Sequence, residues 1–253
     1  MTLQSINPAT GETIERYETF TPAQVDSALA RAMLAFSHHR GTRLEERAER
    51  MRAVAEVLDS GKERWAELLT REMGKTLKSA VAEVQKCAVA CRHYADHTAG
   101  YLADEPMTSG ASRSYVRHLP IGPVLAVMPW NFPFWQVFRF AAPAIMAGNV
   151  ALLKHASNVP GCALAIEEIF RLGGFEHGVF QTLLVGSDAV AKIVADPRVR
   201  AATVTGSEGA GAAVASMAGQ HLKKVVLELG GSDPFIVMPS ADIAAAAKAA
   251  VGA

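Results

Sequence analysis

The stretch Val124-Leu125-Ala126-Val127-Met128-Pro129-Trp130-Asn131 begins with an uninterrupted apolar run that stops at Pro129, and from here on the sequence alternates between strand and helix patterns. Helical patterns separate it from the apolar runs that follow. Continuous apolar strands that alternate with helices are typical of a parallel sheet covered on both faces. We therefore predict an α/β fold with strands at 124–128, 150–153, 180–185, 201–204, 225–229 and 235–238, and helices at about 134–147, 158–172, 187–196 and 207–219.

The chain before residue 110 has a different pattern, which predicts helices. Thr21 is a capping residue, and Pro22 follows it at the first helical position. Apolar residues then recur at helical spacing as far as residue 99. Residues 112–119 alternate polar and apolar side chains, which predicts an exposed strand. The predicted helices begin at Pro22 and cover about 44–58, 65–73 and 77–99.

Composition excludes several classes of partner. The chain has 253 residues, half of them hydrophobic, which is enough for a large core. Its 25 basic and 25 acidic residues balance, so no net field attracts nucleic acid or an anionic membrane. The apolar runs are too short to span a bilayer, the first residues do not resemble a signal peptide, and three cysteines suit a reducing compartment. We expect a cytoplasmic protein.

Residues with chemical potential cluster where the predicted strands end. Asn131 lies between two prolines, Lys154 ends the next strand, Gly206 and Ser207 open a helix, and Glu228 precedes two glycines. The carboxyl ends of parallel strands share one edge of a sheet, where open α/β sheets bind ligands. We therefore expect these side chains to converge on one site.

Each of these residues allows a chemical and a purely structural interpretation. Lys154 can bind phosphate or ribose oxygens, or it is a solvated lysine at a strand exit. Gly206 and Ser207 can accommodate a pyrophosphate, or they form an ordinary turn; neither a P-loop nor a G-x-G-x-x-G motif is present. Asn131 can donate to a developing oxyanion, or it caps a rigid turn. Glu228 is costly at a strand end unless it is solvated, paired or catalytic.

Together these segments resemble the NAD(P)-dependent aldehyde dehydrogenase superfamily. The four motifs occur in that family's order, and the likeness starts at Ile6-Asn7-Pro8 and covers essentially the whole chain. The subgroup that the chain most resembles is the bacterial succinate-semialdehyde dehydrogenases, of which it matches the amino-terminal half. The four motifs are Pro129–Pro133, Lys154–Ser157, Val204–Ser207 and Glu228–Gly231.

The resemblance implies a Rossmann-like cofactor domain and a role for each motif. Asn131 would stabilise the oxyanion of the thiohemiacetal and thioester stages, and Glu228 would act as the general base for deacylation. Its presence favours hydrolysis to a free acid over transfer to coenzyme A. No metal is implied. The implied cofactor-binding residues are Trp130, Asn131, Lys154, His155, Ala156, Ser157, Gly186, Gly206, Ser207 and Leu229.

Two residues indicate cofactor and substrate preference. Family members that prefer NAD often carry a glutamate three residues after the lysine, at the position of Ser157 here. Without that glutamate there is no carboxylate to repel a 2′-phosphate, so the sequence favours NADP and leaves NAD open. Arg139 matches the position where the succinate-semialdehyde subgroup uses an arginine, and its guanidinium could bind the distal carboxylate of a semialdehyde. The alternative for Arg139 is a surface residue of an amphipathic helix.

The family's cysteine nucleophile, in a Gly-Gln-x-Cys segment, does not occur in this sequence. Cys87, Cys91 and Cys162 lie elsewhere, in helical patterns. We therefore expect residues 1–110 to be the helical part of the cofactor domain, 111–121 a strand of the oligomerisation arm, and 122–253 the Rossmann-like region, with the catalytic domain absent and the chain inactive alone. The intact enzyme would be a homo-oligomer.

Three alternatives stay open. The chain can be a nucleotide-binding fragment without catalytic activity. It can be a relative of the acyl-phosphate reductases, although these should not need Glu228-Leu229-Gly230-Gly231. A purely structural module would leave the four motifs unexplained.

Overall fold

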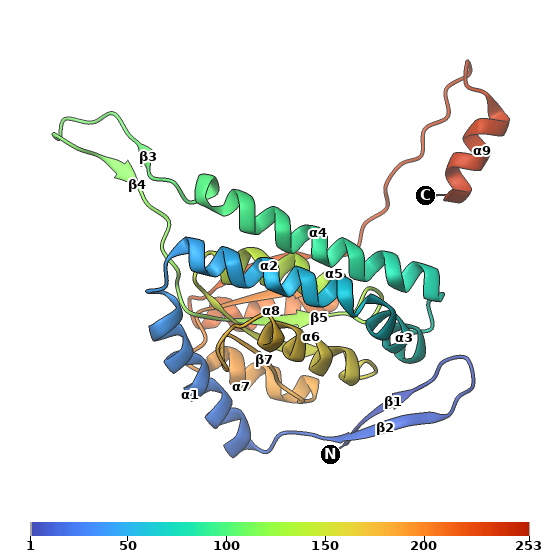
Figure 1. Cartoon of the computed structure of the whole chain (residues 1–253), viewed down its shortest axis with the longest axis horizontal. Helices are drawn as coiled ribbons and strands as arrows, with labels where there is room; N and C mark the ends of the chain where they lie inside the picture. The colour runs from blue at the N-terminus through green and yellow to red at the C-terminus, as the bar shows by residue number, and fades with distance from the viewer. Residues whose placement is uncertain (1, 253) are drawn as a thin grey trace.

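The computed structural model describes residues 2–252; Met1 and Ala253, the outer ends of the predicted regions, lie outside the described part. A central parallel sheet carries helices on its faces, and two hairpins and the last helix project from the body (Figure 1). The elements are β1 (Thr2–Ile6), β2 (Thr13–Glu18), α1 (Pro22–His39), α2 (Leu44–Ser60), α3 (Lys62–Met73), α4 (Leu77–Tyr101), β3 (Glu105–Pro106), β4 (Tyr115–Val116), β5 (Pro123–Met128), α5 (Trp135–Met146), β6 (Val150–His155), α6 (Pro160–Leu172), β7 (Phe180–Thr182), a 3-10 turn η1 (Ser187–Ala189), α7 (Val190–Ala195), β8 (Ala201–Thr205), α8 (Glu208–Gln220), β9 (Lys224–Glu228) and α9 (Ile243–Gly252).

The amino-terminal helices lie within three residues of each bound that the sequence predicts. At the start of α1, Thr21 and Gln24 form a capping box: the Gln24 amide donates to Thr21 Oγ1 (3.3 Å), and the Thr21 amide donates to Gln24 Oε1 (2.8 Å). Helix α3 ends at Gly74, whose φ of +88° is the left-handed conformation that glycine adopts without strain.

The five-stranded sheet has the order β7-β6-β5-β8-β9, and all its strands are parallel. Right-handed crossovers place α5 and α6 on one face and α7 and α8 on the other. The contacts agree, since α2 packs on both α5 and α6 while α7 packs on α8. The order in which strands are added reverses at β5, because β6 and β7 extend the sheet on one side of it and β8 and β9 on the other. Such sheets bind ligands in the crevice at this point, outside the carboxyl ends of the strands. The predicted Rossmann-like fold is confirmed.

One hydrophobic core joins the helical region to the sheet. Phe170 of α6 stacks on Phe138 of α5 (ring centroids 5.3 Å apart) and on Phe180 of β7 (4.7 Å). Helix α2 packs closely on the end of α6: a Cβ added at Gly173, the residue directly after α6, would lie only 2.3 Å from Val54 Cγ2. The site-bearing strands are therefore supported from behind by residues far from them in sequence.

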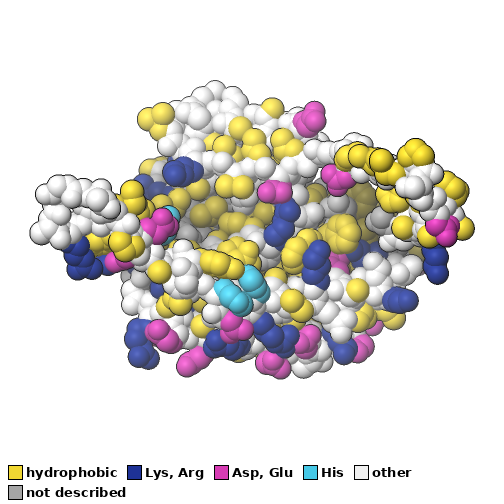
Figure 2. All heavy atoms as spheres, turned by 90° about the horizontal axis from the view of Figure 1, so that it is seen from above, with side chains coloured by type: hydrophobic (Ala, Val, Ile, Leu, Met, Phe, Trp, Pro, Cys, Tyr) yellow, Lys and Arg dark blue, Asp and Glu magenta, His cyan; other side chains and the backbone are white. Residues whose placement is uncertain are grey.

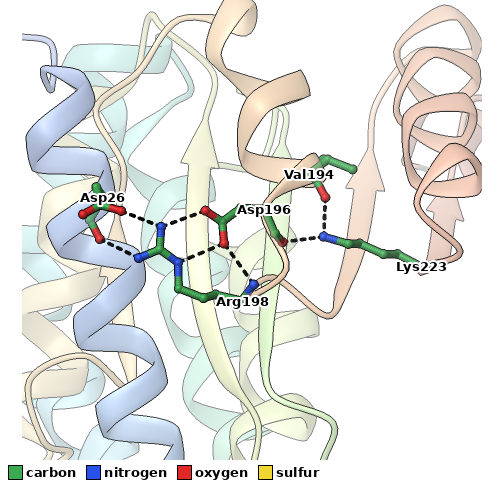
Figure 3. Close-up of polar contacts among 5 residues, drawn as sticks. All are labelled: Asp26, Val194, Asp196, Arg198 and Lys223. Atoms are coloured by element: carbon green, nitrogen blue, oxygen red, sulfur yellow. Dashed lines mark hydrogen bonds and ion pairs between the residues drawn. The ribbon is translucent and has the colours of Figure 1, made fainter.

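A charged network fastens α1 to the turn before β8 (Figure 3). The Arg198 guanidinium lies between two carboxylates, with Nη2 2.6 Å from Asp26 Oδ1 and 2.7 Å from Asp196 Oδ2. Lys223 donates to the main-chain carbonyl of Val194 and to that of Asp196, the latter at 2.5 Å. The network therefore links the α7–β8 connection to α1 through Arg198 and to the residue before β9 through Lys223.

Five local predictions need correction. Residues 235–238 form no strand, because the chain leaves the body after β9 and finds no neighbour to pair with (Figure 1). The strand predicted at 112–119 is reduced to β4, which pairs only with β3, and the strand predicted at 180–185 ends at Thr182. Strand β9, which pairs only with β8, is mostly exposed rather than buried. The β1–β2 hairpin lies in a region predicted to be helical.

The face seen from above is hollowed between the two projecting segments, and hydrophobic side chains gather in the hollow (Figure 2). Exposed apolar residues of β9 and the segment after it include Val226, Phe235, Ile236 and Met238. Within residues 2–252, no helix is both long and apolar enough to cross a bilayer.

Candidate functional site

Asn131 lies at the tip of the turn that follows β5. Its Oδ1 accepts the amide hydrogen of Phe132 at 3.1 Å, which leaves the side-chain NH2 free of any partner among residues 2–252. Trp130 and Phe132, on either side of it, are also exposed. The turn therefore presents an amide donor whose orientation is set by its own backbone.

Three buried groups support this turn from behind. Glu83 Oε1 of α4 accepts from the amides of Phe134 and Trp135, both at 2.9 Å, and its Oε2 pairs with the Lys75 ammonium. On the other side, the His155 ring lies 2.8 Å from the Pro133 carbonyl oxygen. Burial lowers the pKa of His155 to about 4, so the ring is neutral at pH 7.

Arg139 and Glu228 meet at the same edge of the sheet. Arg139 Nη1 lies 3.2 Å from Glu228 Oε2, and Nη2 donates to Thr205 Oγ1, also at 3.2 Å. Both side chains line a groove of about 390 Å³ between α5 and the strands β8 and β9. Apolar and small residues make up most of its remaining wall, including Met128, Phe140, Pro143, Ala144, Ala202 and Val226.

Lys154, the residue before the last one of β6, carries a half-buried ammonium without a hydrogen bond or ion pair to any described residue. Burial lowers its pKa, because desolvation disfavours the charged form. Ser157, three residues on, is exposed. A cation that lacks a protein partner beside an exposed hydroxyl fits the phosphate or ribose of a nucleotide.

Gly206 and Ser207 connect β8 to α8. The Gly206 amide donates to the Glu228 carbonyl oxygen (3.0 Å), and Ser207 caps α8 by accepting from the Ala210 amide (3.3 Å). A Cβ at Gly206 would meet no atom within 4 Å, so the space beside this turn is open. The first turn of α8 thus faces open space with its amide groups, although Glu208 adds a negative charge there.

The remaining predicted residues lie in different surroundings. The side chain of His155 is buried and both its ring nitrogens are hydrogen-bonded, since Nδ1 accepts from the Ala156 amide at 2.9 Å, so the imidazole has no free nitrogen for a ligand. Leu229 packs on Gly211 of α8. Gly186 lines a separate cavity of about 370 Å³ beside α1 and α7 and is not part of the groove of Arg139 and Glu228.

The three cysteines are buried, and burial raises the pKa of each thiol. A buried thiol with a raised pKa is a poor nucleophile at neutral pH. No group of three metal-ligating side chains occurs within the described residues.

A model of the aldehyde dehydrogenase family matches residues 1–253. The chain belongs to the aldehyde dehydrogenase family. This aldehyde dehydrogenase chain is 53% identical to a probable succinate-semialdehyde dehydrogenase (NADP(+)) of Synechocystis over 253 residues, which are 100% of the chain and 56% of that relative. It is 55% identical to succinate-semialdehyde dehydrogenase (NADP(+)) 1 of Mycobacterium tuberculosis strain H37Rv over 254 residues, covering 99% of the chain and 56% of the relative.

Solved structures agree with this membership. Succinic semialdehyde dehydrogenase from Streptococcus pyogenes, in complex with NADP+, matches with a TM-score of 0.92 and 38% identity over 95% of this chain and 53% of that one. Succinate-semialdehyde dehydrogenase from Burkholderia pseudomallei matches with a TM-score of 0.94 and 30% identity over 100% and 53%. The aldehyde dehydrogenase chain spans about half the length of the relatives it matches.

Sequence reasoning missed Glu72, Lys75 and Glu83 of this aldehyde dehydrogenase chain. Glu72 accepts from the amides of Gly161 (3.0 Å) and Cys162 (2.7 Å) at the start of α6, as Glu83 does at the start of α5. A signal was present, because both glutamates fall on the apolar stripe of their helix, where an acid is costly unless paired.

Proposed function

We propose that the chain is the cofactor-binding part of an NADP-dependent aldehyde dehydrogenase that oxidises succinate semialdehyde to the free acid. The observation that carries this proposal is the contact of Arg139 with Glu228 at 3.2 Å. A cation suited to a distal carboxylate and a carboxylate suited to general-base catalysis share one groove. The relatives named succinate-semialdehyde dehydrogenase support the same substrate class.

The residues at the carboxyl edge of the sheet would hold the cofactor. Lys154 and Ser157 would bind the adenosine ribose and its 2′-phosphate, and the turn Gly206-Ser207 at the start of α8 would receive the pyrophosphate. Trp130 and Asn131 would border the nicotinamide. His155, Ala156 and Leu229 would contribute through main-chain atoms, and Gly186 would contact the cofactor from the β7 side. When bound, NADP+ supplies a hydride acceptor.

The side chains of this chain would then act on the aldehyde. Asn131 would donate its side-chain amide hydrogen to the aldehyde oxygen as that oxygen gains negative charge. Glu228 would accept a proton from the water that releases the acid from its thioester. Arg139 would bind the distal carboxylate with two hydrogen bonds and so select carboxylated aldehydes. The thiolate that forms the thiohemiacetal would come from outside residues 1–253, since all three cysteines here are buried.

The projecting β3–β4 hairpin, which includes residues 111–121 in part, would serve as an oligomerisation arm of a cytoplasmic homo-oligomer. In the described structure it extends away from the body, with Tyr115 and Val116 exposed (Figure 1). Exposed apolar residues on a two-stranded hairpin favour pairing with another chain.

The test is NADP-dependent oxidation of succinate semialdehyde by the complete gene product, followed through NADPH absorbance. Rapid reduction of NADP+ with this substrate, and slower reduction with an uncharged aldehyde of similar length, is the expected result. A gene product that reduces neither NADP+ nor NAD+ with any aldehyde would overturn the proposal.

A second candidate is nucleotide binding without oxidation by this chain alone, which the burial of all three thiols favours. Titration of residues 1–253 with NADPH, followed through the fluorescence of the exposed Trp130, separates the two. Binding without turnover supports the second candidate for the isolated chain.

A further inference from the structure

Glu83 places a buried carboxylate behind the turn of Asn131. The residue is 3% exposed and lies on the apolar stripe of α4 beside Ala80, Val84 and Cys87. Moving a carboxylate from water into such a place costs several kcal/mol unless its oxygens find partners. Both oxygens do: Oε1 receives the amides of Phe134 and Trp135, and Oε2 receives the Lys75 ammonium.

The two amides that donate hydrogen bonds to Glu83 belong to Phe134, the residue before α5, and Trp135, its first residue. Helix α5 has no side-chain cap of its own, so Glu83 replaces one from a distant part of the chain. Its negative charge also lies at the positive end of the α5 dipole, which strengthens the contact.

Lys75 contacts the same turn a second time. Its ammonium lies 4.0 Å from the centroid of the Phe132 ring, the residue next to Asn131, as a cation–π contact. The lysine is therefore bonded to Glu83 and packed on Phe132 at once. Its side chain is 7% exposed, so these contacts are largely shielded from water.

His155 holds the turn from the opposite side. Because the Pro133 carbonyl can only accept and the Ala156 amide can only donate, Nε2 carries the ring proton and Nδ1 is the acceptor. The imidazole thus joins the end of β6 to the turn after β5 in a single tautomer.

We propose that Glu83, with Lys75 and His155, is a positioning residue that fixes the turn of Asn131 so that its side-chain amide points at the developing oxyanion. The inference rests on the proposed function. Three contacts hold residues 132–134: Glu83 of α4 accepts from the Phe134 amide, Lys75 packs on the Phe132 ring, and His155 of β6 donates to the Pro133 carbonyl oxygen. Asn131 remains exposed at the tip of the turn. An oxyanion donor contributes most when it is held in place before the reaction, and a displacement of about 1 Å can cost on the order of 100-fold in rate.

The first test measures the turn without any catalysis. Hydrogen–deuterium exchange of the peptide containing Phe134 and Trp135 is compared between residues 1–253 and the Lys75→Met/Glu83→Leu double variant. The double change removes both buried charges together, so no unpaired charge is left in the core while the two amides lose their acceptor. We expect exchange of this peptide to accelerate at least 10-fold, with no change in the β6 peptide. Unchanged exchange overturns the proposal.

The second test measures catalysis in the complete gene product. We expect the double variant to lower kcat about 10- to 100-fold with KM for NADP+ changed less than about 3-fold. Glu83→Gln should act in the same direction. In an Asn131→Ala background the double change should cost less than about 3-fold, because the group that it positions is already gone. An equal loss in both backgrounds would show a general structural effect and overturn the proposal.

Glu167→Gln is the matched control. Glu167 Oε2 also accepts a main-chain amide, that of Thr182 at 2.7 Å, but on β7 and away from the turn. We expect kcat and the exchange of the Phe134 peptide to stay at wild-type values in this variant. If the wild-type gene product oxidises no aldehyde, the proposed function fails, while the exchange experiment still decides whether Glu83 orders the turn.

Discussion

Arg139 and Glu228, which lie 89 residues apart in the sequence, form an ion pair at the carboxyl edge of the sheet, with Nη1 3.2 Å from Oε2. The guanidinium belongs to α5, after β5, and the carboxylate ends β9. A substrate carboxylate that binds Arg139 must therefore compete with Glu228. A substrate carboxylate that binds Arg139 would therefore also free Glu228, the proposed base, from its ion pair.

Replacing Arg139 with alanine should impair carboxylated aldehydes selectively. Loss of a charge-assisted hydrogen bond costs about 1.5–3 kcal/mol, which corresponds to about 10- to 150-fold in kcat/KM for succinate semialdehyde. Butanal, which has the same carbon chain without a carboxylate, should lose less than about 3-fold. Steady-state kinetics of the complete gene product checks this, with Arg64→Ala as a control on an exposed arginine outside the groove. Equal losses with both aldehydes would contradict a role in substrate selection.

Replacing Glu228 with glutamine should slow release of the acid more than hydride transfer. Removing a general base costs about 10²- to 10⁴-fold in the step that it serves. Rapid mixing of the variant with substrate and NADP+ should give a burst of NADPH followed by slow turnover. If the burst itself is lost, the role of Glu228 lies in an earlier step than deacylation.

Replacing Ser157 with glutamate should weaken NADPH binding at least 10-fold and leave NADH binding within about 3-fold. The reason is repulsion between the new carboxylate and the 2′-phosphate beside Lys154. Fluorescence titration measures both affinities, and Ser157→Ala separates loss of the hydroxyl from gain of charge. Parallel changes in NADPH and NADH affinity would place the ribose elsewhere.

The free energy of unfolding should fall as the pH is lowered from 7 towards 4. Burial lowers the pKa of His39 and of His155 to about 4, so both are neutral in the folded chain. In the unfolded chain they take up protons below about pH 6.5, and the unfolded state then gains stability. Each contributes on the order of 2–3 kcal/mol that is present above pH 6.5 and lost as the pH approaches 4. Urea unfolding at pH 7 and pH 5 measures this loss.

His155→Gln provides the check on that pH dependence. A glutamine cannot take up the proton, so the variant should lose less stability between pH 7 and pH 5 than the wild type. If the two proteins lose the same amount, the buried imidazole is not the group responsible.

The sequence was sufficient for the fold of residues 122–228 because the signals there are local. Apolar runs that stop at Pro129 or at a glycine predict strands there, and in the helical region Thr21 followed by Pro22 predicts the start of α1 in the same local way. Residues 235–238 show the limit of that reasoning. Their composition suits a strand, yet a strand exists only where a neighbour offers hydrogen bonds, and the described structure provides none.

Residue types and their spacing were enough to identify the family, the parallel sheet and the positions of Asn131, Lys154, Gly206 and Glu228 at the ends of strands. Which side chains meet followed only from the packing of separate elements. Because packing brings α4 onto α5, Glu83 bonds the turn of Asn131 from 51 residues away, and because β9 lies beside β8, Glu228 reaches Arg139. Such pairings depend on how separate elements pack against one another, and local residue type and spacing do not determine that packing.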